Sequence, residues 1–222
     1  MDFTQILDWG GNFIYAMLAL VALYGAFTVI LLLRRIQEKQ FSNAAADEFL
    51  EQVREKLQTK DFDGVAELCD SPAYWSKAVP QLVLFALNKK EQTMSRLRRG
   101  LAETFEREIL ADLEYRMSWV GTIVKSAPML GLLGTVIGMI SAFQQLDLAQ
   151  SAGGEGGEQL AGAISVALFT TAAGLAVAIP LVLAGALINV RIGRLQDGVQ
   201  HWIGEFLDDY EVAVGSAGGR DS

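Results

Sequence analysis

Three long stretches of the chain contain almost no charged residues, and they constrain the fold more than any other feature. Residues 13–33 and 160–190 carry no charge, and residues 119–143 carry only Lys125. A helix of about 21 residues rises roughly 30 Å, which is the thickness of the hydrocarbon core of a bilayer. The sequence therefore predicts an all-α, polytopic membrane protein with three transmembrane helices.

The charged residues are concentrated between and after these stretches. In residues 34–118 acids and bases alternate, and apolar residues such as Val53 and Leu57 recur at helical spacing. A helix that begins near Gln92 meets no breaker except Gly100 before the second stretch. We therefore expect helices that extend well beyond the membrane, the last of them continuous with the second span.

Lysine and arginine residues set the expected orientation. The first dozen residues and residues 144–159 contain none, whereas 16 of the 18 bases lie in residues 34–118 and 191–219. Cytoplasmic segments are enriched in these residues, so both base-free segments are expected outside the inner membrane. The predicted order is a periplasmic N-terminus (1–12), transmembrane helix 1 (13–33), a cytoplasmic helical region (34–118), transmembrane helix 2 (119–143), a periplasmic loop (144–159), transmembrane helix 3 (160–190) and a cytoplasmic C-terminal helix and tail (191–222).

Several functional classes are disfavoured by composition. A net charge of −8 argues against nucleic-acid binding. Cys69 and His201 are the only cysteine and histidine, so one chain can build neither a disulfide nor a Cys/His zinc site. No paired carboxylates or Ser/His arrangement lie at either membrane interface. We expect no metal, no cofactor and no enzymatic activity.

The second and third spans carry small and hydroxylated residues in a pattern typical of close helix packing. Gly131, Gly134 and Gly138 lie in the second span, and Gly174 lies in the third. Small residues four apart allow a neighbouring helix to approach. Two prolines, Pro128 and Pro180, interrupt the backbone hydrogen bonding of these spans.

Three threonines lie among these residues: Thr135 in the second span, and Thr170 and Thr171 in the third. One interpretation is that each hydroxyl bonds to a carbonyl of its own helix, and the other is that they form a polar constriction for ions. Lys125 likewise has two interpretations, a snorkelling side chain or part of an ion exit path. Because the spans contain no aspartate, glutamate or histidine, proton transport would need a partner to supply the carboxylate.

The segments APMLGLLGTVIGMISAF (127–143) and AISVALFTTAAGLAVAIP (163–180) resemble the ExbB/TolQ/MotA proton-channel family, in its three-span ExbB/TolQ-like branch. The resemblance implies a homopentamer around two copies of an ExbD/TolR/MotB-like single-span protein, whose membrane aspartate carries the proton. It further implies that Thr135 and Thr171 line the pore, and that a TonB- or TolA-like protein is a further partner. Val166 stands where many members have a glutamate.

The resemblance predicts a proton-channel or stator subunit that uses proton-motive force for transport or mechanical work at the cell envelope. The alternative is a non-conducting structural scaffold built on the same helix packing. A solute permease is disfavoured, because three spans without an internal repeat or broken half-helices are unlike such transporters. The envelope process served, and the choice between protons and sodium ions, stay open at this point.

Overall fold

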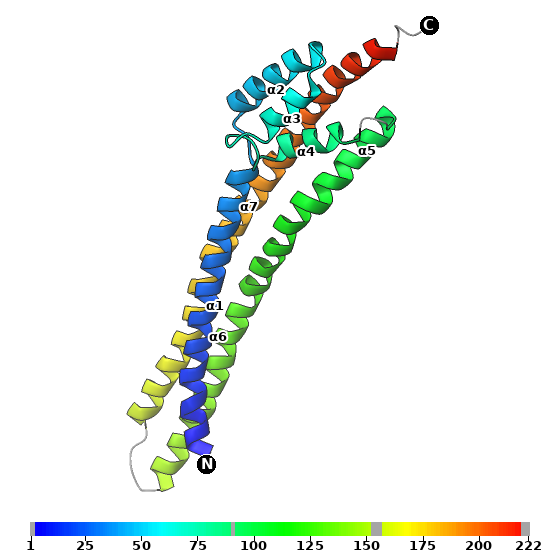
Figure 1. The fold of residues 1–222 in the computed structure, drawn as a ribbon. Helices are drawn as coiled ribbons and strands as arrows, with labels where there is room; N and C mark the ends of the chain where they lie inside the picture. Colours follow the sequence, from blue (N-terminus) through cyan, green and yellow to red (C-terminus); the bar gives the residue numbers. More distant parts are fainter. Residues whose placement is uncertain (1–2, 90–91, 152–156, 219–222) are drawn as a thin grey trace. The chain divides into compact units, whose positions relative to one another are not determined.

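The computed structural model describes residues 3–89, 92–151 and 157–218, and within them the regular structure is entirely helical. Figure 1 shows the order of the elements along the chain. They are α1 (Phe3–Lys39), α2 (Asn43–Gln58), α3 (Phe62–Cys69), α4 (Ala78–Leu87), α5 (Met94–Thr104), the π-helix η1 (Phe105–Leu110), α6 (Ala111–Ser151) and α7 (Gly157–Gly218).

Three of these helices are long and apolar enough to cross a membrane, as the sequence predicts. The candidate spans lie within Phe13–Gln58, Met94–Asp147 and Leu160–Val214. The expected continuity from the charged region into the second span is also confirmed, because α5, η1 and α6 follow one another without a break.

The predicted loop over 144–159 is too long. Helix α6 continues to Ser151 and α7 already begins at Gly157. Residues 144–151 are mainly glutamine, leucine and alanine, which favour helix even though they end the apolar stretch. The glycine-rich residues 152–156, and the tail residues 219–222, lie outside the described part of the chain.

The predicted C-terminal helix is not a separate element. It is the second half of α7, which runs from Gly157 to Gly218 and contains Pro180 in its interior. The change from apolar to charged residues near Arg191 therefore marks a change of surroundings along one helix.

The chain divides into two units, which we call the apolar unit (Met1–Leu31 and Arg116–Leu187) and the polar unit (Leu32–Tyr115 and Ile188–Ser222). In the apolar unit α1, α6 and α7 run side by side (Figure 1). A methyl group added at Gly25 of α1 would lie 2.7 Å from a Leu181 methyl of α7 and 3.4 Å from Ile123 of α6. The rings of Tyr24 and Trp119 meet edge to face at 6.3 Å.

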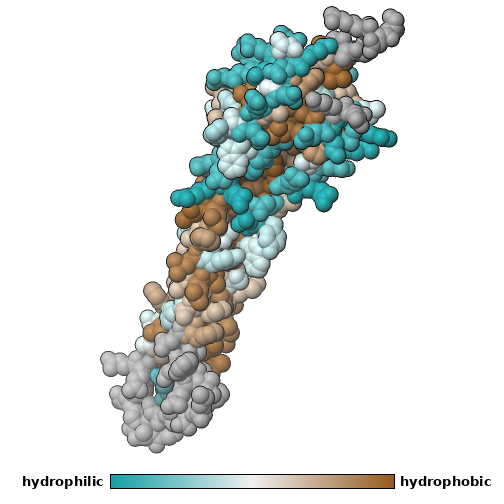
Figure 2. All heavy atoms as spheres, in the orientation of Figure 1, coloured by the Kyte–Doolittle hydropathy of each residue, from teal (hydrophilic) through white to brown (hydrophobic). Residues whose placement is uncertain are grey.

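Most large side chains of the apolar unit point outward. Figure 2 shows hydrophobic residues over its visible surface and hydrophilic residues over the polar unit. Such a surface is stable against lipid or against other apolar helices, and not in water. The outward residues include Leu20, Leu23 and Phe27 of α1, Met129, Leu132, Leu133 and Phe143 of α6, and Leu168, Phe169, Ile179 and Leu183 of α7.

The polar unit has a core of large side chains, as expected of a unit that folds in water. Phe41, Phe49 and Tyr74 form an aromatic cluster, with ring centroids 5.0–5.8 Å apart. Trp202 of α7 contacts Phe41 at 6.4 Å. Asp61 caps α3 by accepting a hydrogen bond from the Gly64 amide at 2.9 Å.

The π-helix η1 is not foreseen by the sequence pattern. The buried positions keep a four-residue spacing from Leu97 to Ile109, and Leu110 adds a second buried position at the end of η1. An α-helix turns adjacent residues 100° apart, whereas a wide π turn brings residues four and five positions on toward the same side. The bulge therefore joins the buried face of α5 to that of α6.

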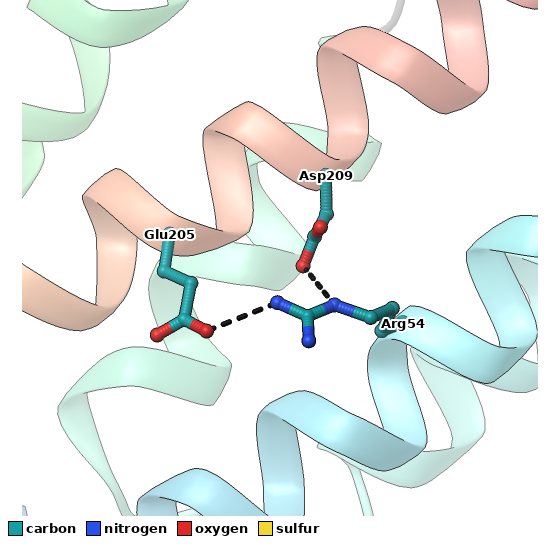
Figure 3. A network of polar contacts seen from close by, with 3 residues as sticks. All are labelled: Arg54, Glu205 and Asp209. Atoms are coloured by element: carbon teal, nitrogen blue, oxygen red, sulfur yellow. Dashed lines mark hydrogen bonds and ion pairs between the residues drawn. The ribbon is translucent and has the colours of Figure 1, made fainter.

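Ion pairs of Arg54 with two acidic residues link α2 to α7 within the polar unit. Arg54 donates to Asp209 at 2.9 Å and to Glu205 at 3.0 Å, and the two acids lie one turn apart on α7 (Figure 3). The hydrogen bond to Asp209 is the main cause of the raised pKa of Arg54. All three side chains are partly exposed, so water and salt screen the attraction.

We expect the apolar core to stabilise the polar unit far more than this ion-pair cluster does. Phe206 is fully buried and stacks on Tyr210 at 5.6 Å. Phe206→Ala should lower the free energy of unfolding by about 3–5 kcal/mol. Arg54→Ala should lower it by less than about 1 kcal/mol. Guanidinium unfolding of the purified protein in mild detergent, followed by circular dichroism, measures both changes. A larger effect of Arg54→Ala than of Phe206→Ala would contradict the prediction that the apolar core stabilises the polar unit more.

A second prediction concerns Cys69, which is completely buried at the end of α3. Burial, with a smaller effect of Asp70, raises the pKa of its thiol from 9.0 to about 12. The thiolate is the reactive form, so its population at neutral pH falls about a thousandfold. Cys69 should resist alkylation by iodoacetamide in the folded protein and react at once after denaturation, as mass spectrometry of the labelled chain would record. Rapid labelling of the folded protein would contradict this burial.

Candidate functional site

The backbones of α6 and α7 approach most closely at two glycines. A methyl group added to Gly131 would lie 2.7 Å from the carbonyl oxygen of Thr170 and 3.0 Å from the Cα of Thr171. A methyl group on Gly174 would lie 2.6 Å from the carbonyl oxygen of Ala127 and 3.2 Å from the Cα of Gly131. These neighbours are backbone atoms that cannot rotate away, so the crossing requires glycine on both helices.

The contact continues along α6 at the next two glycines. A methyl group on Gly134 would lie 2.6 Å from the Thr170 hydroxyl, and one on Gly138 would lie 2.6 Å from the Ala167 side chain. The glycines singled out from the sequence therefore line one face of α6 that packs against α7. We call this contact the glycine seam, comprising Gly131, Gly134 and Gly138 of α6 with Ala167, Thr170 and Gly174 of α7.

Three threonine hydroxyls lie in the glycine seam. Thr170 donates to Ala167 O at 2.7 Å or to Gly131 O at 3.0 Å, and Thr171 reaches Gly131 O at 3.2 Å. Thr135 reaches Ala167 O at 3.1 Å and Gly131 O at 3.3 Å, and its hydroxyl also bonds to that of Thr171. Thr135 and Thr170 can each bond to a carbonyl of their own helix and across to the other helix, whereas the contacts of Thr171 are with Gly131 and Thr135 of α6. The interpretation as a polar constriction for ions stays a prediction.

The number of hydroxyl hydrogens limits how many of these hydrogen bonds can form at the same time. Each hydroxyl has one hydrogen to donate and two lone pairs, so the contacts of Thr135 and Thr171 cannot all form at once. A self-consistent arrangement has Thr135 donating to Ala167 O while it accepts from Thr171. Reorienting the hydroxyl hydrogens exchanges one set of acceptors for another without moving the helices.

The three threonines differ in exposure. Thr170 is 4% exposed and lies between the helices, where its hydroxyl completes the seam. Thr135 and Thr171 are half-buried, so part of each side chain faces out of the three-helix unit. Only these two can offer a hydroxyl to something outside the protomer while they remain bonded within it.

The remaining residues singled out from the sequence lie away from this cluster. Pro128 and Pro180 are inside continuous helices, Pro128 half-buried and Pro180 exposed. Lys125 is exposed on α6. Val166 is 59% exposed on α7, so a side chain at this position faces the surroundings of the protomer.

The site contains no group that can store a proton by itself. Threonine hydroxyls do not titrate in the physiological range, and the three spans contain no carboxylate or imidazole. No group of three potential metal ligands from histidine, cysteine, aspartate and glutamate occurs among the residues that the structure describes. The arrangement can orient and solvate a polar group of another molecule, but it cannot carry charge alone.

The sequence pattern did not reveal the carbonyl groups that complete the site. Gly131 O is within reach of all three hydroxyls, and Ala167 O is within reach of two. A partial signal existed, because Thr135 lies four residues after Gly131 and Thr170 lies three after Ala167. The inter-helix register, which brings both carbonyls to the same cluster, is a tertiary property.

The part of the chain that contains the glycine seam lies within a match to a known protein family. The model of the MotA/TolQ/ExbB proton channel family matches residues 74–201. The chain is 34% identical over 108 residues to the Tol-Pal system protein TolQ of Haemophilus influenzae, covering 49% of this chain and 46% of the relative. It is 36% identical over 129 residues to a putative biopolymer transport protein, ExbB-like 1, of Synechocystis, covering 54% and 46%.

A longer alignment at lower identity is with a putative ExbB homologue of Methanothermobacter thermautotrophicus. It shows 26% identity over 189 residues, which is 85% of this chain and 63% of the relative. The matched part of the chain thus spans about half the length of the first two relatives and somewhat more of the third.

We expect replacement by alanine to change thermal stability very differently at two glycines of α6. Gly131→Ala places a methyl group against the backbone of α7, so it should separate the helices and lower the thermal midpoint by several degrees. Gly121→Ala is the matched control, because a methyl group there meets nothing within 4 Å and alanine favours helix. Thermal unfolding of both variants in the same detergent tests this, and equal midpoints would argue against the close crossing.

Proposed function

Because the chain belongs to the MotA/TolQ/ExbB proton channel family, we propose that it is the proton-channel or stator subunit of an inner-membrane motor. It is a multi-pass protein with three apolar helices suited to the inner membrane. The proposed task is to use proton-motive force to energise transport or mechanical work at the cell envelope. The names of its relatives, a Tol-Pal system protein and biopolymer transport proteins, agree with a task of this kind.

The observation that carries the proposal is the hydroxyl pair of Thr135 and Thr171. The two side chains join α6 to α7 and remain half-buried within spans that contain no acid. A protonated carboxyl group of a partner could accept from or donate to such hydroxyls, and a carboxylate could accept from them. Thr170 has a different proposed role, because its burial places it in the seam that holds the two helices.

The carboxylate is proposed to come from a partner of the ExbD/TolR/MotB kind, a single-span protein with a membrane aspartate. Five copies of this chain would surround two copies of that partner. The outward apolar residues of α1, α6 and α7 support such an assembly, since they suit contact with lipid and with neighbouring apolar helices. A TonB- or TolA-like protein would then receive the work outside the membrane.

The energy available for each step is modest. Moving one elementary charge through 100 mV provides about 2.3 kcal/mol, so several protons are needed for a substantial mechanical step. A ring of equivalent hydroxyl pairs would let the partner aspartates pass the same site in succession. Rotation of the partner within the ring is the motion that this arrangement favours.

The proposed orientation places the N-terminus in the periplasm and the polar unit, with the C-terminus, in the cytoplasm. The lysine and arginine distribution supports it. Conduction in this protein would proceed without a glutamate at position 166, where Val166 presents an apolar surface. Two hydroxyls with no added carboxylate favour protons over sodium ions.

A non-conducting scaffold is the second candidate function, and the glycine seam favours it equally well. The two functions differ in their need for the exposed hydroxyls, because a scaffold requires only the packing residues.

We expect Thr135→Val and Thr171→Val to reduce proton flux by about tenfold or more, since each removes a hydroxyl that would bond to the partner's carboxyl group. The chain is co-expressed with a candidate single-span partner, and the complex is reconstituted in vesicles that contain a pH-sensitive dye. Native mass spectrometry of the same samples should show five copies of this chain with two of the partner.

Two controls separate conduction from packing. Thr122→Val removes an exposed hydroxyl that bonds only to Ser118 O of its own helix, at 2.9 Å, and should leave the flux unchanged. Thr135→Ser keeps the hydroxyl and should retain most of the flux. If complexes of the Thr135→Val and Thr171→Val variants assemble fully and still support the envelope process that depends on this protein, the scaffold function would be favoured.

A further inference from the structure

The polar unit contains a cavity of about 500 Å³ between the end of α1, α4 and the middle of α7. Its volume lies in the range of ligand sites, which is roughly 300–1,000 Å³. The polar part of its lining includes Lys39, Asn43, Arg194 and His201, and the apolar part includes Phe41 and Trp202. Two of these polar residues, Lys39 and Arg194, are cations, which suit an anionic ligand.

The two cations of this cavity lie just beyond the charge-free stretches. Lys39 is six residues past Leu33 on α1, a rise of about 9 Å, and Arg194 is four residues past Val190 on α7, about 6 Å. The headgroup layer extends roughly 5–8 Å beyond the hydrocarbon core on each side. Both side chains are long enough to reach back into that layer.

Both cations lack a direct ion-pair partner in the described part of the chain, although carboxylates lie near Lys39. Lys39 donates to the Gln81 side chain at 2.8 Å. Burial and then the charge of Arg35 lower the pKa of Lys39, against opposing effects of Glu38, Asp112 and Glu108. A lysine in this position is more stable as a cation when an anion joins it.

We propose that this cavity binds the phosphate of an anionic phospholipid of the cytoplasmic leaflet. Arg194 offers a planar fork that matches two phosphate oxygens, and Lys39 offers a point charge on the other wall. Asn43 adds an amide donor. One carboxylate, that of Asp197, also lines the cavity, and the two cations outnumber it.

The position of the two cations favours a lipid over free phosphate. Lys39 and Arg194 lie within about 9 Å and about 6 Å of the charge-free stretches, close to the level expected for the lipid phosphates. Basic cavities beside transmembrane helices on the cytoplasmic side are typical binding sites for anionic headgroups. The inference is independent of ion conduction, because it concerns other residues and a different ligand.

The test is native mass spectrometry of the full chain released from nanodiscs that contain equal amounts of phosphatidylglycerol and phosphatidylcholine. The unmodified protein should retain phosphatidylglycerol preferentially. Lys39→Gln and Arg194→Gln should each reduce the retained fraction by about tenfold, because each removes one charge-assisted bond. Arg194→Lys should give a smaller loss, since the charge remains and the fork is gone.

Arg191→Gln is the matched control, because Arg191 is an exposed arginine one turn earlier on the same helix and does not line the cavity. Its retention of phosphatidylglycerol should equal that of the unmodified protein. Equal losses in Arg191→Gln and Arg194→Gln would indicate a diffuse surface charge effect and overturn the proposal. Displacement of the lipid by millimolar inorganic phosphate would overturn the lipid assignment in favour of a free phosphate site. Retention of both lipids alike would overturn any anion site.

Discussion

The close crossing of α6 and α7 at Gly131 and Gly174 is the contact on which the candidate site depends. The Thr135 hydroxyl reaches Ala167 O at 3.1 Å and the Thr171 hydroxyl reaches Gly131 O at 3.2 Å only because the two backbones are this near. A single added methyl group would lie within 2.7 Å of a backbone oxygen. The glycines therefore determine where the threonines lie, and the threonines in turn bond to the carbonyls that the glycines expose.

The two units are stabilised in different ways, and the difference follows from their surroundings. In the apolar unit the contact of α6 with α7 buries small residues such as Ala167 and Thr170, and many large residues face outward, since lipid gives no hydrophobic gain for burying leucine. In the polar unit Phe49 and Phe206 are completely buried, because water favours the removal of large apolar side chains. Helix α7 passes through both units, so the size of its buried residues changes along its length.

Much of this could be predicted from the sequence, because hydropathy and charge act over long stretches. The three apolar spans and the continuity of the charged region with the second span both follow from such local signals. The ends of the spans were less accurate, since residues 144–151 lose apolar character without losing helix propensity. The π turn at Phe105–Leu110 was not predicted, because it depends on joining two buried faces.

For the candidate site, too, the sequence identified the residues, whereas their burial depends on the tertiary structure. The residue pattern alone grouped Thr135, Thr170 and Thr171, and only the family resemblance singled out Thr135 and Thr171. Adjacent residues on a helix point in directions 100° apart. Only the register of α6 against α7 decides that Thr170 is enclosed while Thr171 is half-buried. Periodicity identifies a face of one helix, but it does not determine which position on the partner helix lies opposite.

A site built from hydroxyls and carbonyls separates the positioning of a proton from its storage. Threonines within acid-free spans can present donors and acceptors without binding a proton themselves, so the proposed carrier must be able to move past them. A carboxylate fixed in these helices would instead remain at one depth. In the proposed assembly, spans without acid suit a fixed ring that acts on the carboxylate of a moving partner, and the glycine seam would keep the hydroxyls in place.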